Sequence, residues 1–219
     1  MKKSLSAAVS IALTALVFGN AQADSGGHVY NVKITNVTRG QVITPPVLVS
    51  HSAGFELFSL GAPASPELTK LAEDGMSDDL VAQLANTRAV YDVATAAGPL
   101  LPGQSVNLQI SVKRGYPQLS AVGMLASTND AFFAMRGVQV PLFGKVEVEA
   151  GAYDAGTETN NESCVYIPGP PCGSGGVRDT SGAEGYVHVH AGIHGIADLD
   201  PATHDWRNPV VEVAISKMR

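Results

Sequence analysis

The sequence predicts an all-β protein: an antiparallel two-sheet sandwich of about eight strands, with short helices at its periphery. Several segments alternate apolar and polar side chains with a period of two, which is typical of half-buried antiparallel strands. These segments are widely spaced and do not alternate regularly with helical segments, which argues against a parallel α/β sheet. The chain of 219 residues is long enough to bury a substantial core.

The alternation is clearest in four segments. In residues 30–35 and 105–112, apolar side chains occupy every second position. The same pattern recurs in residues 145–149 and 211–215. Weaker strand candidates bring the total to about eight, and they are residues 47–50, 55–59, 119–126 and 186–190.

Two short segments depart from the strand pattern and are predicted to be helices. Residues 66–73 begin with Pro66, a residue that favours the first turn of a helix. Residues 77–86 begin with Ser77, a good N-cap residue, followed by two aspartates. We expect both helices to lie outside the sheets.

Residues 1–23 are predicted to be a secretory signal peptide. They combine two lysines near the start, an apolar run over residues 7–18 and a small-residue cleavage motif that ends at Ala23. The apolar run is shorter than the roughly 20 residues of a membrane-spanning helix. We therefore expect residues 24–219 to be exported as one β-sandwich domain without a membrane span, to the periplasm or to the extracellular space.

The charge of the chain restricts its partners. The formal net charge is −6, and removal of the predicted signal peptide with its two lysines changes it to −8. A surface this acidic repels nucleic acids and anionic membranes. We expect no nucleic-acid partner; the expected ligand is an unidentified protein or glycan, and the sequence leaves the oligomeric state open.

Two cysteines, Cys164 and Cys172, flank a loop rich in proline and glycine. In an oxidising compartment we expect them to form a disulfide bond. Closing so short a loop contributes roughly 2–3 kcal/mol to stability, which is enough to order the loop.

An acidic turn, Tyr-Asp-Ala-Gly-Thr-Glu at residues 153–158, follows one of the alternating segments. Gly156 permits backbone conformations that would let Asp154 and Glu158 converge on a hard cation, with neighbouring carbonyl oxygens as further ligands. The alternative is an ordinary solvated loop on an acidic protein.

Four motifs occur in a fixed order: Ser-Thr-Asn-Asp within residues 124–133, the turn at 153–158, Gly-Tyr-Val-His-Val-His at 185–190 and Gly-Ile-His-Gly at 192–195. Together they resemble the spondin domain, which has a Ser-Pro-Ser/Asn-Asp turn followed by an Asp-Ala-Gly-Thr-Asp turn. The resemblance runs from about residue 28 to the C-terminus and is that of a bacterial, single-domain, secreted member. It implies an eight-stranded antiparallel sandwich with a calcium ion at one end.

By position, the resemblance makes Asp130 and Asp154 calcium ligands. Glu158 stands where the family has aspartate, and its longer side chain leaves three arrangements open: bidentate binding, binding through water, or facing away. Calcium accepts six to eight oxygen ligands and tolerates the first two arrangements. For Asp130 the alternative is that it only caps a turn.

Three histidines form the basis of a competing hypothesis. His188 and His190 are two apart on a predicted strand and share a face, and His194 follows a glycine-containing turn. Such a set could bind zinc or copper, as in a periplasmic transition-metal protein or metalloenzyme. Two polar strand residues that face solvent are the simpler interpretation.

From these observations we expect a secreted, calcium-binding β-sandwich that acts in binding or adhesion and is not an enzyme. The histidine-based metalloprotein is the alternative, and a purely structural sandwich without an ion is a third possibility.

Overall fold

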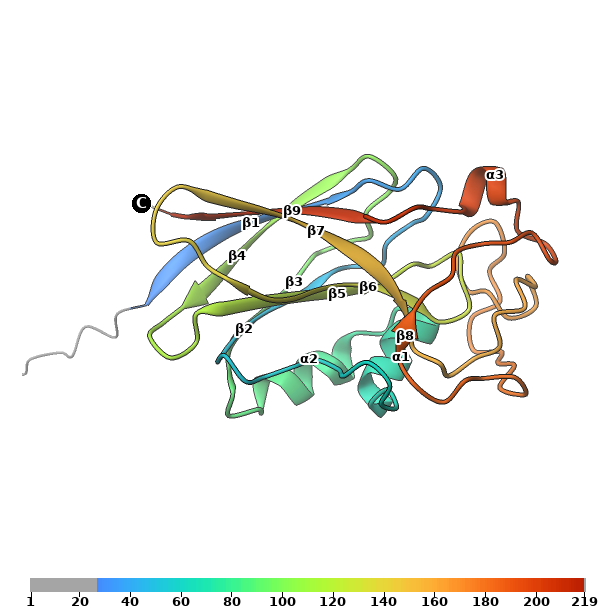
Figure 1. Ribbon diagram of the computed structural model, residues 1–219, viewed down its shortest axis with the longest axis horizontal. Coiled ribbons are helices and arrows are strands. Elements are labelled where there is room, and N and C mark those ends of the chain that lie inside the picture. The colour runs from blue at the N-terminus through green and yellow to red at the C-terminus, as the bar shows by residue number, and fades with distance from the viewer. Residues whose placement is uncertain (1–26, 219) are drawn as a thin grey trace, which may run out of the picture.

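The computed structural model describes residues 27–218, so the predicted signal peptide lies outside the described residues. Within this range the chain forms nine strands and three helices (Figure 1). The strands are β1 (His28–Asn36), β2 (Val47–His51), β3 (Val90–Thr95), β4 (Ser105–Val112), β5 (Gln118–Met124), β6 (Ala131–Gln139), β7 (Lys145–Asp154), β8 (His188–Val189) and β9 (Val211–Lys217). The helices are α1 (Pro66–Asp74), α2 (Asp78–Ala85) and α3 (Pro201–His204).

The strands pair in an antiparallel manner throughout and form one sheet. Its order is β3-β2-β5-β6-β7-β9-β1-β4, and β8 is added beside the end of β7. β7 connects the two halves of the sheet, because residues 145–150 pair with β9 whereas residues 151–154 pair with β6. In Figure 1, β7 accordingly crosses from the layer of β1, β4 and β9 to the layer of β5 and β6.

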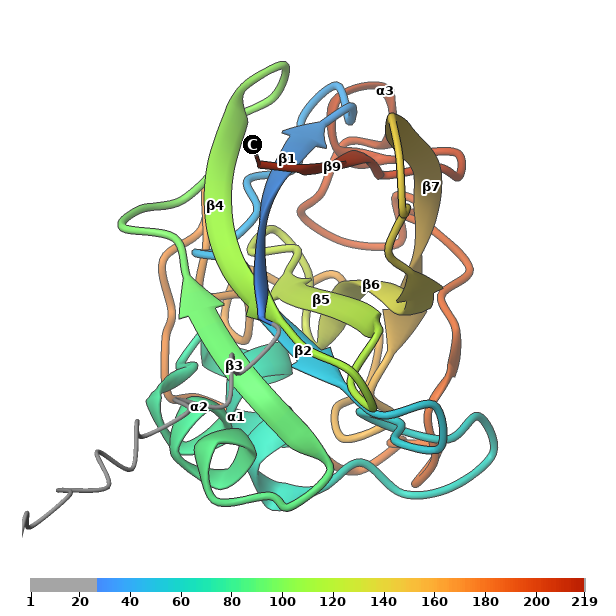
Figure 2. The ribbon, with the colours of Figure 1, turned by 90° about the vertical axis from the view of Figure 1, so that its left-hand side faces the viewer.

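The two ends of this path, β3 and β4, approach each other and are joined through side chains (Figure 2). The Ser111 amide of β4 donates a hydrogen bond to Asp92 Oδ2 of β3 at 2.7 Å. Ser50 Oγ of β2 donates to the Ser111 carbonyl at 2.8 Å. The prediction of an all-β antiparallel protein is thus confirmed, but the two expected sheets are halves of one continuous, nearly closed sheet.

Two hydrophobic clusters occupy the two faces of the β2-β5-β6 half. One fills the interior of the nearly closed sheet and includes Leu48, Leu119 and Phe133. The other lies between the outer face of these strands and helices α1 and α2, and it includes Val49 and Phe132. β2, β5 and the first part of β6 are therefore buried on both faces.

Helices α1 and α2 confirm the predicted helices to within two residues at each end. In α1, Ser65 Oγ accepts a hydrogen bond from the Leu68 amide, and Gly75 ends the helix in a left-handed conformation with φ of 69°. Ser77 occupies the N-cap position of α2, but its side chain makes no capping hydrogen bond. Among the described residues, no helix is long and apolar enough to cross a membrane.

Several predicted elements were wrong or missing. Residues 55–59 form no strand, and only two residues of the candidate at 186–190 are in one. β3, β6 and α3 were not predicted. β6 was missed because its start, Ala-Phe-Phe-Ala-Met, is buried on both faces and therefore lacks the alternation that marks a half-buried strand.

Candidate metal centre

The two acidic segments meet at the ends of neighbouring strands. Asp154 is the last residue of β7 and pairs with Ala131, the first residue of β6. The carbonyl of Asp130, immediately before β6, accepts a hydrogen bond from the Ala155 amide at 3.2 Å. The antiparallel pairing of β6 with β7 therefore places Asp130 beside the turn that follows Asp154.

Gly156 gives this turn its shape. Its φ of +68° lies in the left-handed region, and an added Cβ would be 2.3 Å from the Tyr186 carbonyl oxygen. The Gly156 carbonyl also accepts a hydrogen bond from the Gly185 amide at 2.8 Å. A side chain at position 156 would thus strain the turn and separate it from the segment that leads into β8.

One oxygen of Asp130 is fixed by the turn, and the other has no donor. Oδ2 accepts from the amides of Thr157 at 2.7 Å and Glu158 at 3.1 Å, and from Thr157 Oγ1 at 3.2 Å. Oδ1 is buried without a hydrogen-bond partner. Burial, and then the nearby charge of Asp154, raise the pKa of Asp130 to about 7.

Asp154 is also buried, but both its oxygens are hydrogen-bonded. Oδ1 accepts from the Gly156 amide at 2.6 Å, and Oδ2 accepts from Asn160 Nδ2 at 2.5 Å. Burial raises the pKa of Asp154, although these two hydrogen bonds oppose the shift. Each carboxylate oxygen carries two lone pairs, so the two hydrogen bonds leave Asp154 able to bind a cation as well.

Glu158 is fully buried and points toward Arg178. Its Oε1 is 3.0 Å from Arg178 Nε, but the angles do not form a hydrogen bond, so both Glu158 oxygens lack a donor. Burial raises the pKa of Glu158 to about 8, although Arg178 opposes the shift. Arg178 also pairs with Glu73 at 2.7 Å and with Asp74, at the end of α1, so it links the turn to that helix.

The three predicted histidines differ in their surroundings. His190 is buried and uses both ring nitrogens: Nδ1 accepts from the Gly192 amide at 2.9 Å, and Nε2 donates to Asn160 Oδ1 at 3.2 Å. Burial lowers the pKa of His190 to about 4. His188 is half-buried in β8, and the side chain of His194 is exposed.

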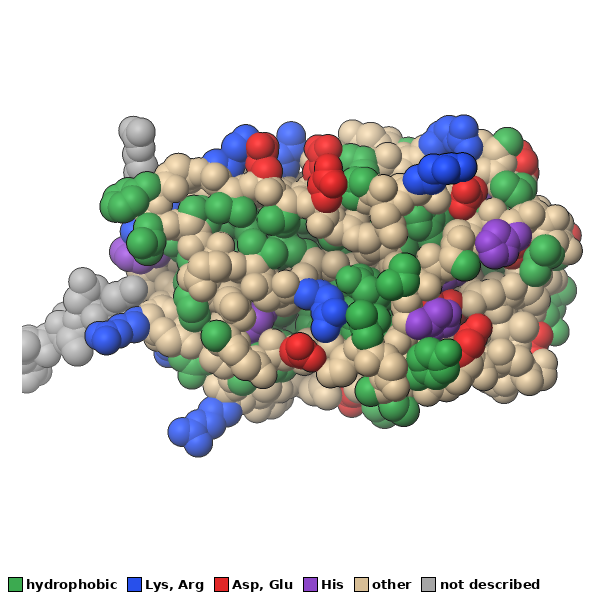
Figure 3. Space-filling view, in the orientation of Figure 1, with side chains coloured by type: hydrophobic (Ala, Val, Ile, Leu, Met, Phe, Trp, Pro, Cys, Tyr) green, Lys and Arg blue, Asp and Glu red, His purple; other side chains and the backbone are tan. Residues whose placement is uncertain are grey.

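A different set of ligand atoms comes together around His188. Within residues 27–218, one group of three metal-ligating side chains has its atoms within 4.8 Å of one another: Asp154, Glu184 and His188. The group lines part of a pocket of about 190 Å³. Acidic and histidine side chains lie next to each other at the end of the molecule that carries β8 (Figure 3).

Glu162 holds the Gly-Ile-His-Gly segment in place. It has a φ of 55°, which is rare for a residue with a side chain, and it is almost fully buried. Its carboxylate accepts hydrogen bonds from three successive amides, those of His194 at 2.5 Å, Gly195 at 2.7 Å and Ile196 at 2.9 Å. The backbone of this segment is thus wrapped around one buried carboxylate.

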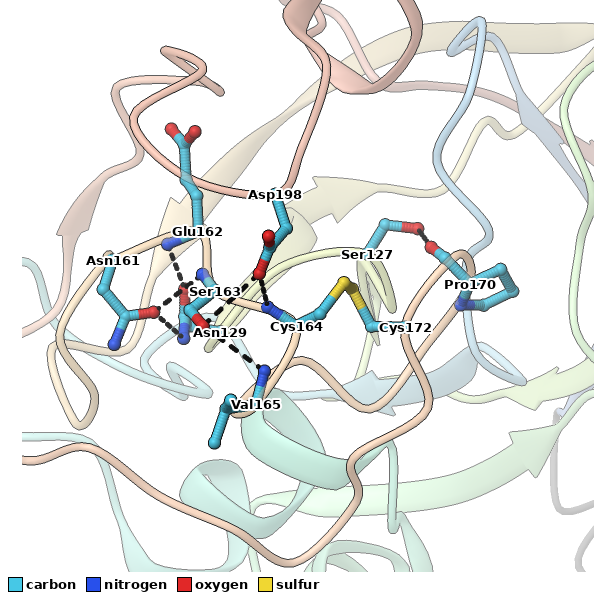
Figure 4. The surroundings of a disulfide bond; sticks show 10 residues. All are labelled: Ser127, Asn129, Asn161, Glu162, Ser163, Cys164, Val165, Pro170, Cys172 and Asp198. Carbon is cyan, nitrogen blue, oxygen red and sulfur yellow. Dashed lines mark hydrogen bonds between the residues drawn. A yellow bond between two sulfur atoms is a disulfide. The ribbon is translucent and has the colours of Figure 1, made fainter.

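The predicted disulfide between Cys164 and Cys172 is confirmed and lies at the same end of the molecule (Figure 4). The Cys164 amide donates to Asp198 Oδ2 at 2.8 Å, which ties the disulfide loop to the segment before α3. Asn129, the neighbour of Asp130, accepts from the Glu162 amide at 3.4 Å. Inside the disulfide loop, the Pro170 carbonyl accepts a hydrogen bond from Ser127 Oγ, so the loop directly contacts the segment that leads to Asp130 (Figure 4).

Four residues around the centre were not predicted: Asn160, Glu162, Arg178 and Glu184. Asn160 and Glu162 directly follow the acidic turn, so proximity in sequence was an available signal. Glu184 precedes His188 by four residues, a spacing that was also visible. Arg178 lies in irregular structure far along the chain, and no periodic pattern indicates its position.

A family model matches the part of the chain that contains the two acidic segments. The family model Spondin_N matches residues 42–164, a range that includes Asp130, Asp154 and Glu158 but ends before β8. No curated protein matches the chain. Because the family model covers more than half of the chain, the protein belongs to the Spondin_N family.

Proposed function

We propose that this protein is a secreted calcium-binding module that acts by binding another molecule and has no catalytic activity. Its family and its disulfide indicate a secreted protein. The calcium proposal depends on one observation. Among the described residues, four buried side-chain polar atoms lack a hydrogen-bond partner, and three of them are the carboxylate oxygens Asp130 Oδ1, Glu158 Oε1 and Glu158 Oε2.

Buried carboxylates are costly unless a cation compensates their charge. Arg178, at 3.0 Å, compensates part of the charge of Glu158, whereas Asp130 Oδ1 has no hydrogen-bond partner. Transfer of an ionised carboxylate out of water costs several kcal/mol. Burial raises the pKa of Asp130 to about 7 and that of Glu158 to about 8, which reflects this cost. A divalent cation between them would keep both groups ionised and offset the penalty.

The proposed ligand atoms fit calcium. They are all oxygens, and calcium binds six to eight oxygens at about 2.3–2.6 Å. We assign Asp130 Oδ1 and the carboxylate of Asp154 as direct ligands. Glu158 Oε1 faces Arg178, which leaves Oε2 as its ligand atom.

The binding role follows from what the ion would connect. It would link the start of β6 to the turn after β7, and the same turn contacts the segment before β8 and, through Arg178, helix α1. Loops on a rigid scaffold are common recognition surfaces. The proposed partner is a protein or glycan that contacts these loops.

The test is a melting curve of the exported chain with calcium and with a chelator. At a calcium concentration about one hundred times Kd, binding to the folded state adds about 2.7 kcal/mol, or roughly 5–10 °C in Tm for a domain of this size. Asp130→Asn and Asp154→Asn should each abolish most of this increase.

Glu149→Gln is the matched control, because Glu149 is an exposed carboxylate on β7, away from the centre. This variant should keep the full increase. Equal melting temperatures of the unmodified protein in calcium and in chelator would refute the calcium proposal.

A further inference from the structure

A second group of metal-ligating side chains shares Asp154 with the calcium centre but has different partners. Asp154, Glu184 and His188 each offer one ligand atom, and these atoms lie within 4.8 Å of one another. Glu184 and His188 lie beyond the end of the family match at residue 164. Two of its three residues therefore lie outside the matched region, whereas Asp154 lies inside it.

The ring of His188 is oriented as in a metal ligand. Its Nδ1 lies 3.3 Å from the Tyr186 carbonyl oxygen, which can only accept, so Nδ1 carries the proton. Nε2 lies 3.8 Å from Asp154 Oδ2, and in the neutral ring it is the nitrogen that can bind a cation. A backbone carbonyl that binds one ring nitrogen while the other faces a cation is the usual arrangement of metal-bound histidines.

The spacing of the atoms suits a shared ion better than a direct bond. His188 Nε2 is 3.8 Å from Asp154 Oδ2, which exceeds hydrogen-bonding distance. Two ligands bound at about 2.0–2.2 Å to a tetrahedral cation are separated by roughly 3.4 Å. A small adjustment of the side chains would bring both atoms to a common ion.

A chain of partly buried hydrogen bonds holds Asp154 in position. His190 Nε2 donates to Asn160 Oδ1 at 3.2 Å, and Asn160 Nδ2 donates to Asp154 Oδ2 at 2.5 Å. Outer partners of this kind orient ligands in established metal sites. His190 thus acts through Asn160 as a positioning residue, which explains why a buried neutral imidazole lies beside a buried carboxylate.

The backbone of the group is also fixed. His188 is paired with Asp154 across the short ladder between β8 and β7. The Val187 amide donates to the Ala62 carbonyl at 2.8 Å, and the Gly185 amide donates to the Gly156 carbonyl at 2.8 Å. Glu184 is exposed at the edge of the 190 Å³ pocket, so solvent reaches the group directly.

From this geometry we propose that Asp154, Glu184 and His188 form a second cation site, which binds a transition metal of the zinc type. One imidazole and two carboxylates are a donor set suited to zinc, whereas calcium prefers oxygen alone. Three protein ligands at the edge of a pocket leave the fourth position of a tetrahedral ion to water or to a small ligand. The site does not depend on calcium binding, although it shares Asp154.

Isothermal titration with Zn²⁺ tests this site in the untagged exported chain, first stripped of metal and then saturated with calcium. We expect about one equivalent of bound zinc, and Co²⁺ in its place should give the visible absorption bands of a tetrahedral site. His188→Ala and Glu184→Gln should each weaken zinc binding by at least about tenfold. The Tm of both variants in chelator, compared with that of the unmodified chain in chelator, serves as the check of folding.

Two further variants separate this site from the calcium centre. His194→Ala removes an exposed imidazole outside the group and should leave zinc affinity unchanged. Asp130→Asn should keep zinc binding while it loses the calcium-dependent increase in Tm. The proposal is overturned if the unmodified chain binds no zinc, if His188→Ala binds zinc as tightly as the unmodified chain, or if Asp130→Asn loses zinc as well.

Discussion

Asp130 shows how one residue can serve both the fold and a binding site. Its Oδ2 accepts three hydrogen bonds from the turn after β7 and so fixes the shape of that turn. Its Oδ1 is buried and has no donor. The hydrogen bonds organise the loop, while the unpartnered oxygen creates an electrostatic cost that a cation would remove.

This cost predicts an unusual pH dependence of the calcium-free protein. The pKa of Asp130 rises from 3.8 in the unfolded chain to about 7, and that of Glu158 from 4.5 to about 8, mainly through burial. Between about pH 4 and pH 8 the folded state therefore holds protons that the unfolded state has lost, so these groups make stability fall as pH rises. Without calcium, the free energy of unfolding should drop by more than about 1 kcal/mol from pH 5 to pH 8.

Urea unfolding at the two pH values, in metal-free buffer, measures this drop. Asp130→Asn should reduce it, because an amide does not titrate, whereas Glu149→Gln should leave it unchanged. Saturating calcium should also reduce it. If the calcium-free protein loses no more stability from pH 5 to pH 8 than the Asp130→Asn variant does, the raised pKa of Asp130 is contradicted.

At the scale of elements, the sequence predicts those strands that have one polar face. β1 and β4 alternate clearly because their outer faces meet solvent. β6 was missed because helices α1 and α2 cover one face of its first half and the interior of the sheet covers the other. Alternation of apolar and polar residues shows that one face of a strand is exposed to solvent. A strand that is buried on both faces lacks this alternation, so the sequence pattern does not reveal it.

The candidate metal centre shows a similar limit: local sequence patterns identify some of its residues and not others. Asp130 and Asp154 could be predicted from two recognisable turns, and the pairing of β6 with β7 brings these turns together. Arg178 could not, because the irregular chain between the disulfide and β8 reaches the centre through tertiary contacts alone. The family resemblance identifies the two turns that carry Asp130 and Asp154. The position of the long loop between the disulfide and β8 depends instead on contacts with the rest of the fold.

Glu162 should control the order of the Gly-Ile-His-Gly segment. In Glu162→Gln, one of the two acceptor oxygens becomes an NH₂ group that faces backbone amides, so one or two of the three hydrogen bonds from residues 194–196 are lost. We expect a loss of about 1–3 kcal/mol in unfolding free energy, with faster hydrogen exchange at these amides. Glu212→Gln, an exposed substitution on β9, should change neither quantity. Unaltered exchange in Glu162→Gln would show that the carboxylate does not hold the segment.

At the scale of the whole molecule, a single sheet wraps around one core and places its functional residues at one end. The loops after β5 and β7 and the segment around β8 meet at that end, opposite the β6–β7 connection (Figure 1). The sheet is closed differently from an ordinary barrel, because side chains and not a backbone ladder join β3 to β4. We therefore expect closure to depend on these few polar groups.

Asp92 is the residue on which this closure should depend most. Its two oxygens accept from the Val93 amide at 2.9 Å and from the Ser111 amide at 2.7 Å, so Asp92→Ala leaves both amides without these acceptors. We expect Asp92→Ala to lower the unfolding free energy by about 1–3 kcal/mol and to increase hydrogen exchange in β3 and β4, while the calcium-dependent increase in Tm persists. Asp92→Asn keeps one acceptor oxygen and should lose less. If Asp92→Ala is as stable as the unmodified chain, the contacts between β3 and β4 do not close the sheet, and the apolar interior alone holds its two ends together.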